Sequence, residues 1–171
     1  MQTKSLSLQR LTREDYGWLC ALYADPEIME YIGTGVRTFE VASGVLDKML
    51  AAPPPAGYWT LRDRQTGEPL GAGMLMIRHE GSPLEVGFLL AKRAWGRGLA
   101  TEATRALLRH AFTELNVPLV EAYTDTRNDA SAKVLLKAGF RDAGITAGPY
   151  GTPDRRFSAG RDEWMRSSQA T

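Results

Sequence analysis

The chain has 171 residues, 43% of them hydrophobic and 24% charged, which is an ordinary composition for one globular domain, 1–171. The formal net charge of +1 points to neither nucleic acid nor an anionic membrane as a partner. A single cysteine, Cys20, excludes an intramolecular disulfide, and no run approaches the roughly 18 apolar residues of a membrane span. We therefore expect a cytoplasmic protein.

The first half of the chain predicts a strand, two helices and a three-strand meander. Leucines that alternate with polar residues indicate the first strand, Leu6–Leu11. Thr12 is suited to cap one helix and Thr38 a second, with a short helical turn at Pro26–Tyr31 between them. The strands of the meander follow at Tyr58–Arg62, Leu70–Arg78 and Leu84–Leu90.

The hydrophobic period changes in the second half. Apolar residues at intervals of four, from Leu99 to Leu115, indicate an amphipathic helix. A strand at Leu119–Asp125 and a helix from Asn128 to a C-terminal Gly139 come next. The remaining predictions are a strand from Phe140, a loop at 148–153, a strand from Arg155 to about Trp164, and a disordered tail at 167–171.

A glycine-rich turn, Trp95–Ala100, joins the meander to the amphipathic helix. The first turn of a helix leaves about four N–H groups without internal partners, and the helix dipole makes that end partly positive. Gly96 and Gly98 remove side-chain bulk there, so an anionic phosphate can sit on the backbone donors. Arg93 and Arg97 add positive charge at the rim. Two glycines can also simply make a tight turn, but the strand before and the helix after favour a phosphate site.

Two common nucleotide signatures fit this turn poorly. The P-loop pattern G-x-x-x-x-G-K-[ST] does not occur in the sequence. A Rossmann fingerprint needs a third small residue where Thr101 stands, and the meander before Gly96 does not supply repeated parallel βαβ units. Asp125 does end the next strand, so a dinucleotide-dependent oxidoreductase stays open as a minor alternative.

The pattern R-x-x-G-x-G-x-A at Arg93–Ala100, after the strand Glu85–Leu90, resembles the acyl-CoA-binding motif of the GNAT N-acetyltransferase superfamily. Further segments resemble its ribosomal-protein, RimJ/RimL-type branch, and the resemblance runs from about Leu6 to Trp164. Those segments are Asp25–Tyr31, Trp95–Ala103, Asn128–Ser131 and Lys137–Phe140.

The resemblance implies an α+β fold, a three-layer α/β sandwich. Its mixed, mostly antiparallel sheet of about six or seven strands would be flanked by helices and would splay between the strands of Glu85 and Tyr123. Acetyl-CoA would be the cofactor and CoA the product. Pantetheine would pair with the strand backbone as an added strand does, and the pyrophosphate would meet N–H groups at the start of the helix. The implied cofactor-binding residues are Phe88, Leu89, Leu90, Arg93, Gly96, Arg97, Gly98, Leu99, Ala100, Thr101, Asn128 and Ser131.

Amine acetylation requires a neutral amine, a polarised thioester carbonyl and a leaving thiolate. A backbone N–H near Leu89 or Leu90 is the natural donor to the developing oxyanion. Glu85, on the strand that would line the cleft, is our candidate base, since some family members place a catalytic glutamate there. An ordinary surface carboxylate on an alternating strand is the competing interpretation of Glu85.

The general acid is where this sequence departs from the family. Many members carry a tyrosine where Leu135 stands, and the RimJ/RimL-type branch carries a glutamate in place of Leu136. A thiol with a pKa near 8.5 leaves as an anion at small cost, so a general acid helps without being essential. Ser131, Tyr123 or a water molecule remain as candidates for this role.

The expected function is acetyl transfer to a primary amine, either a protein or peptide N-terminus or a small-molecule amine. Tyr31 and Glu85 are expected to contact this acceptor, and family analogy suggests a homodimer. His79 and His110 lack metal-spaced partners, so we expect no metal. The main alternative, motivated by Leu135 and Leu136, is an acyl-CoA-binding sensor that has lost catalysis.

Overall fold

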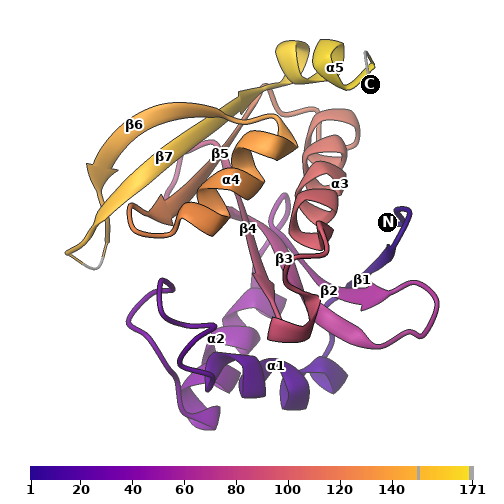
Figure 1. Ribbon diagram of the computed structural model, residues 1–171, viewed down its shortest axis with the longest axis vertical. Helices are drawn as coiled ribbons and strands as arrows, with labels where there is room; N and C mark the ends of the chain where they lie inside the picture. The colour runs from indigo at the N-terminus through magenta and orange to yellow at the C-terminus, as the bar shows by residue number, and fades with distance from the viewer. Residues whose placement is uncertain (150, 170–171) are drawn as a thin grey trace.

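The computed structural model describes residues 1–149 and 151–169, and its centre is a seven-stranded sheet (Figure 1). The strands lie in the order β1-β2-β3-β4-β5-β7-β6. Only the neighbours β4 and β5 are parallel. The expected mixed, mostly antiparallel sheet is confirmed. The bounds are β1 Leu6–Arg10, β2 Gly57–Asp63, β3 Pro69–Ile77, β4 Leu84–Leu90, β5 Leu119–Asp125, β6 Arg141–Ala147 and β7 Pro153–Gly160.

Helices cover both faces of this sheet. Figure 1 shows α1 and α2 on one side and α3 and α4 on the other. Their bounds are α1 Tyr16–Tyr23, α2 Phe39–Ala51, α3 Leu99–Thr113, α4 Asp129–Ala138 and α5 Arg161–Gln169, with short 3-10 helices η1 Arg13–Asp15 and η2 Lys92–Ala94. Two of the three N-caps predicted from the sequence are confirmed: Thr38 Oγ1 accepts from the Val41 N–H (3.4 Å), and Asn128 Oδ1 accepts from the Ser131 N–H (3.0 Å). The third, Thr12, precedes the 3-10 helix η1, and α1 begins only at Tyr16.

Two hydrophobic clusters sandwich the sheet, and β4 contributes to both. Val86 and Leu90 belong to the cluster that contains Leu107 of α3, whereas Leu89 belongs to the cluster that contains Leu46 of α2. This separation follows from the period of two in a strand, which sends successive side chains to opposite faces. β4 is therefore held from both sides.

The sheet opens between β4 and β5. These strands pair at only two positions, Leu84 with Val120 and Glu85 with Glu121. Beyond them, β4 stays paired with β3 as far as Leu90, and β5 stays paired with β7 as far as Asp125. The two halves of the sheet thus separate in the direction of the glycine-rich turn, which confirms the expected splay.

Three local predictions need correction. The segment Pro26–Tyr31 forms turns, with one Met29 N–H to Asp25 carbonyl bond of 3.0 Å, and no helix. The last strand ends at Gly160 and not near Trp164, because Arg161 begins α5, whose first turn carries acidic residues that suit a helix N-terminus. The tail expected to be disordered is helical at 167–169, and residues 170 and 171 lie outside the described part of the chain.

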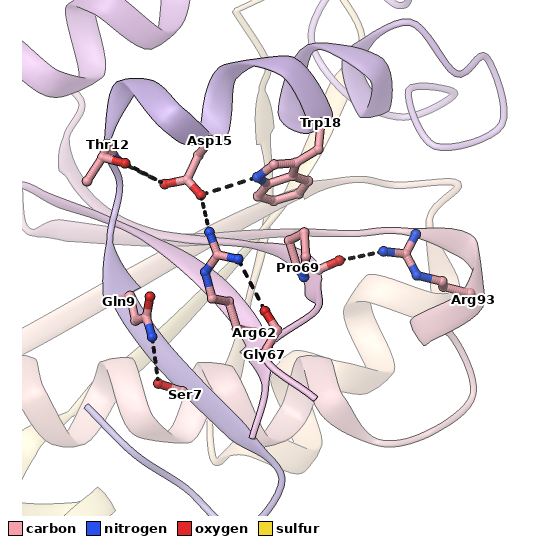
Figure 2. A network of polar contacts seen from close by, with 9 residues as sticks. All are labelled: Ser7, Gln9, Thr12, Asp15, Trp18, Arg62, Gly67, Pro69 and Arg93. Carbon is pink, nitrogen blue, oxygen red and sulfur yellow. Dashed lines mark hydrogen bonds and ion pairs between the residues drawn. The ribbon is translucent and has the colours of Figure 1, made fainter. Parts of the chain in front are cut away.

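The buried carboxylate of Asp15 ties the α1 layer to the sheet (Figure 2). It accepts hydrogen bonds from the Thr12 N–H (2.9 Å), from Trp18 Nε1 (3.2 Å) and from Arg62 Nη2 (2.7 Å). The same guanidinium donates to the Gly67 carbonyl at 3.2 Å. The start of α1 is thereby fixed to the hairpin between β2 and β3.

This network predicts a pH-dependent contribution of Asp15 to stability. Burial alone raises the pKa of Asp15, but the hydrogen bonds from Thr12 and Trp18 and the charge of Arg62 outweigh it and hold the pKa below its ordinary value of 3.8. We expect Asp15→Asn to lower the free energy of unfolding at pH 7 by about 2 kcal/mol, because the partly buried Arg62 loses its counter-ion and the buried network loses a charged acceptor. Urea denaturation measures this difference.

The folded-state pKa lies below the unfolded one, so the stabilisation is complete above pH 3.8 and is lost as pH falls through the folded-state pKa. The difference between the wild type and Asp15→Asn should therefore shrink in strong acid. A difference of equal size at pH 7 and in strong acid would contradict this account of the network.

Candidate functional site

The glycine-rich turn leaves the start of α3 open. Gly96 and Gly98 both have left-handed backbones, with φ of +72° and +76°, and a Cβ on either would meet nothing within 4 Å. The first helical hydrogen bond runs from the Glu102 N–H to the Gly98 carbonyl (3.1 Å). The N–H groups of residues 99–101 thus have no helical partners. They form an uncovered set of donors at the positive end of the helix dipole.

A cavity of about 490 Å³ lies over these donors. β4, the glycine-rich turn, α4 and the loop after α1 supply its walls. The expected cofactor residues that line it are Phe88, Leu89, Leu90, Gly96, Gly98, Leu99, Ala100, Thr101, Asn128 and Ser131. Residues from distant parts of the sequence therefore meet where the resemblance placed them.

The two arginines of the turn do not line this cavity. Arg93 Nε pairs with Glu68 at 2.8 Å, and its Nη2 donates to the Pro69 carbonyl at 2.5 Å, so its side chain is directed at the β2–β3 hairpin (Figure 2). Arg97 Nη2 lies 3.6 Å from Asp63 on the same hairpin. Both arginines have carboxylate partners and connect the turn to the sheet.

Positive charge comes to the cavity from α4. Lys133 and Lys137 line it, are exposed, and lie four residues apart on one helix face. Neither lysine was predicted as a site residue from the sequence. Their four-residue spacing along the predicted helix was the available signal, because it places the two lysines on one face.

The backbone of β4 presents polar groups to the gap beside β5. The Ala91 N–H donates to the Leu70 carbonyl of β3 (2.9 Å), so by strand alternation Leu89 also faces β3, whereas Phe88 and Leu90 face the gap. The Leu90 carbonyl accepts from Trp95 Nε1 at 3.0 Å. Of the two residues expected near the oxyanion, only Leu90 directs its N–H toward the gap.

A second cavity, of about 610 Å³, adjoins the first and is lined by residues of α2, β3, β4 and β5, with Asp154 of β7. It contains Glu85, Tyr123 and Leu135. The residues that line both cavities are Glu30, Tyr31, Ile32, Phe88, Leu89, Asn128 and Ser131. The two cavities therefore adjoin at these shared side chains, beside the opening between β4 and β5.

Comparison with known proteins identifies the family. Residues 5–141 match the acetyltransferase (GNAT) domain family. The chain is 30% identical over 151 residues to the uncharacterized N-acetyltransferase p20 of Bacillus licheniformis, covering 85% of this chain and 84% of that protein. The chain belongs to the GNAT acetyltransferase family.

Other similarities agree with this assignment. An FsC-acetyl coenzyme A-N(2)-transacetylase of Aspergillus fumigatus is 28% identical over 187 residues, covering 97% of this chain and 78% of that protein. A GNAT-family acetyltransferase from Bacillus anthracis superimposes with a TM-score of 0.85 at 20% identity, covering 95% of this chain and 99% of the other. Spermidine N-acetyltransferase from Vibrio cholerae, solved with CoA and spermine, gives 0.81 at 18% identity with the same coverage. At these identities the two structures support the GNAT fold alone.

Glu85 is a buried carboxylate in a two-point ion pair. Arg78 Nε lies 2.6 Å from Glu85 Oε2 and Nη2 lies 3.0 Å from Oε1, and Glu85 is only 7% exposed. The hydrogen bonds to Glu85 raise the pKa of Arg78. The guanidinium also lies 3.9 Å from the centre of the Tyr123 ring. Glu85 thus lines the second cavity with both of its oxygens engaged.

The two candidate proton donors differ in availability. Burial and then the hydrogen bond from its hydroxyl to Glu121 (2.6 Å) raise the pKa of Tyr123 to about 12. Tyr123 is therefore protonated at neutral pH, and its hydroxyl already donates a hydrogen bond to the Glu121 carboxylate. Ser131 lines both cavities. Leu135 is buried beside it, whereas the side chain of Leu136 is exposed and lines neither cavity.

Two tryptophans of the chain take structural or peripheral positions. Trp59 is buried, with its ring 5.5 Å from that of His110. Trp95 is half-exposed and lines the first cavity. Within residues 1–149 and 151–169, no group of three or more His, Cys, Asp or Glu side chains could hold a metal ion. No helix in that part of the chain is both long and apolar enough to cross a bilayer.

The Arg78–Glu85 pair predicts non-additive effects on stability. Arg78→Gln would leave a buried carboxylate without its counter-ion, so we expect the free energy of unfolding at pH 7 to fall by about 2 kcal/mol. Adding Glu85→Gln should restore part of this loss, because the double variant no longer buries an unpaired charge. Urea denaturation of the two single variants and the double variant measures the coupling. Losses that simply add would show that the pair is not coupled.

Proposed function

We propose that the protein transfers an acetyl group from acetyl-CoA to a primary amine, which attacks the thioester directly. The observation that carries this proposal is the cleft formed by two adjoining cavities beside the opening between β4 and β5, with open helix donors in the first cavity. Such a cleft can admit a donor and an acceptor from opposite sides. Membership of the RimJ/RimL-type branch, a cytoplasmic location and a homodimer belong to the same proposal, as extensions of the family resemblance.

In this proposal the cofactor occupies the 490 Å³ cavity. Its pyrophosphate accepts from the N–H groups of residues 99–101, and Lys133 and Lys137 supply the positive charge that Arg93 and Arg97 direct elsewhere. Pantetheine amides pair with the gap-facing backbone of Phe88 and Leu90 as an added strand would. Asn128 retains its side-chain NH₂ for the same ligand, because its cap uses only Oδ1.

The chemistry then requires few side chains. The amine nitrogen forms a bond to the carbonyl carbon, a gap-facing N–H of β4 stabilises the oxyanion, and the carbon–sulfur bond breaks to release the thiolate. Glu85 is the proposed proton acceptor for the amine. Ser131 is the better placed of the two proton donors, since Tyr123 is engaged by Glu121. An α-amine has a pKa near 7.7–8.0 and is more often neutral at pH 7 than a lysine side chain, whose pKa is near 10.4. An α-amine therefore depends less on a strong general base.

An acyl-CoA-binding sensor is the second candidate function. The observation that favours it is Leu135, a buried apolar side chain at the position where the resemblance leads us to expect a catalytic tyrosine. A sensor would bind acetyl-CoA and CoA through the same entrance. It would not release thiol faster when an amine is added.

The open entrance predicts loss of cofactor binding in Gly98→Glu. A carboxylate there would occupy the phosphate position and repel the pyrophosphate, so calorimetry should show acetyl-CoA affinity weakened at least about 100-fold from a micromolar starting value. Gly81→Glu is the matched control, because Gly81 has a similar φ of +79°, equally open surroundings, and a position outside both cavities. Equal affinity in the two variants would place the cofactor elsewhere.

The proposed base predicts a selective effect of Glu85→Gln. Because proton transfer by a positioned side chain contributes about 100-fold, kcat should fall by that order while the KM for acetyl-CoA stays unchanged. The fall should be larger for an alkylamine than for a peptide α-amine, which is more often neutral at pH 7. The rate of thiol release from acetyl-CoA, measured with each acceptor, gives kcat and the KM for acetyl-CoA. Glu114→Gln, on an exposed residue just after α3, is the control, and an unchanged rate in Glu85→Gln would remove the base from the mechanism.

A further inference from the structure

The inner wall of the 610 Å³ cavity is apolar and adaptable. Met49 of α2 and Met74 and Met76 of β3 line it, together with Val45. Methionine side chains are flexible and polarizable, and they accommodate apolar groups of varied shape. This wall can accept an aliphatic or aromatic substituent and offers little to a polar one.

A glycine keeps this wall open. Gly87 of β4 lines the same cavity and pairs in register with Met74 of β3. A Cβ at Gly87 would come within 3.1 Å of Met74 Cγ and 3.2 Å of its Sδ. The absence of a side chain at 87 therefore leaves space beside the methionines.

Two of the four carboxylates that line this cavity are paired with an arginine. Glu85 is held by Arg78, and Asp125 is held by Arg127 at 2.7 Å, where the hydrogen bonds from Arg127 lower the pKa of Asp125 to about 2. Three arginines line the cavity, and the third, Arg37, lies over the Tyr23 ring at 5.0 Å. A polycation entering here would meet these three guanidinium groups, two of which already pair with carboxylates.

Glu30 and Asp154 are the two carboxylates of this cavity without an ion pair in the part of the chain that the structure describes, and of these Glu30 is exposed. Asp154, the second residue of β7, pairs in register with Asp125 and is partly buried. Burial raises the pKa of Asp154, although the charge of Arg78 acts in the opposite direction. An ammonium group that reached Asp154 would gain a partner without displacing an arginine.

We infer that the acceptor is a monocationic amine that carries one apolar substituent, with Asp154 attracting the ammonium group and the methionine wall receiving the substituent. This inference rests on the proposed acetyl transfer and names its acceptor class. A free arylalkyl or alkyl amine and the first residue of a peptide share this chemistry. Polyamines and aminoglycosides do not share it, because their further ammonium groups would face Arg37, Arg78 and Arg127.

Thiol release from acetyl-CoA with matched acceptors tests the inference. Phenylalaninamide should exceed both glycinamide and spermidine in kcat/KM by roughly tenfold or more, because only phenylalaninamide combines one ammonium group with an apolar side chain. A peptide with N-terminal phenylalanine distinguishes the two sources: a higher kcat/KM than the amide identifies a peptide acceptor, and a lower one a free amine. Equal or better use of spermidine or glycinamide would overturn the inference.

Neighbouring residues on α2 provide a matched pair of variants. Met49→Glu places a carboxylate in the cavity wall, whereas Leu50→Glu places the same charge on a partly exposed residue that lines neither cavity. The preference for phenylalaninamide over spermidine should fall roughly tenfold in Met49→Glu and stay unchanged in Leu50→Glu. Asp154→Asn should raise the KM for phenylalaninamide by a similar factor.

Acetyl-CoA affinity, measured by calorimetry, should match the wild type in all three variants and serves as the check on folding. Equal preferences in Met49→Glu and Leu50→Glu would overturn the role of the methionine wall. The two levels of proposal fail differently: cofactor binding without amine-dependent thiol release from any acceptor refutes acetyl transfer itself, whereas efficient turnover of spermidine refutes only the acceptor class.

Discussion

The short pairing between β4 and β5 is the constraint on which the rest of the structure depends. After Glu85 and Glu121 the strands diverge, although each remains hydrogen-bonded to its other neighbour. Backbone N–H and C=O groups on the inner edges of a sheet ordinarily pair with the adjacent strand. Here the divergence leaves those of Phe88 and Leu90 available to a ligand, apart from the Leu90 carbonyl that Trp95 engages. An extended molecule with amide groups can then take the place of the missing strand.

The arginines around this opening are paired with carboxylates, so they position the neighbouring elements and are not free to bind a ligand. Arg93 and Arg97 hold the glycine-rich turn to the β2–β3 hairpin, and Arg62 holds the start of α1 to the same hairpin through Asp15. One hairpin thus positions both the helix entrance and the layer that forms the opposite wall. Of these pairs, Arg62–Asp15 contains a buried carboxylate and is the costly one to unpair, whereas the Arg93 and Arg97 pairs are more exposed and contribute less.

Local sequence signals predicted the elements whose ends are marked by caps. Asn128 and Gly139 bounded α4, and the four-residue spacing from Leu99 identified α3. The same reasoning missed α5, because it continued the strand pattern through Arg161 toward Trp164, which packs with its ring 5.5 Å from that of Phe112. The glycine-rich turn was predictable because Gly96 and Gly98 stand next to the predicted helix in the sequence.

The carboxylate partners of the arginines were not predictable, and neither was the absence of an ion pair at Asp154 within the described residues. Strands that meet only in the folded sheet decide which charges pair.

The wall common to the two cavities has a kinetic consequence. Tyr31 and Ile32 border both cavities, and Lys92, just after β4, binds the start of their loop through Asp25 at 2.9 Å and Glu27 at 3.1 Å. A molecule seated over the α3 entrance rests against side chains that also enclose the neighbouring cavity. In the proposed acetyl transfer, the first reactant to bind would therefore complete the surface that the second one meets. This would favour an ordered ternary complex over a substituted-enzyme cycle.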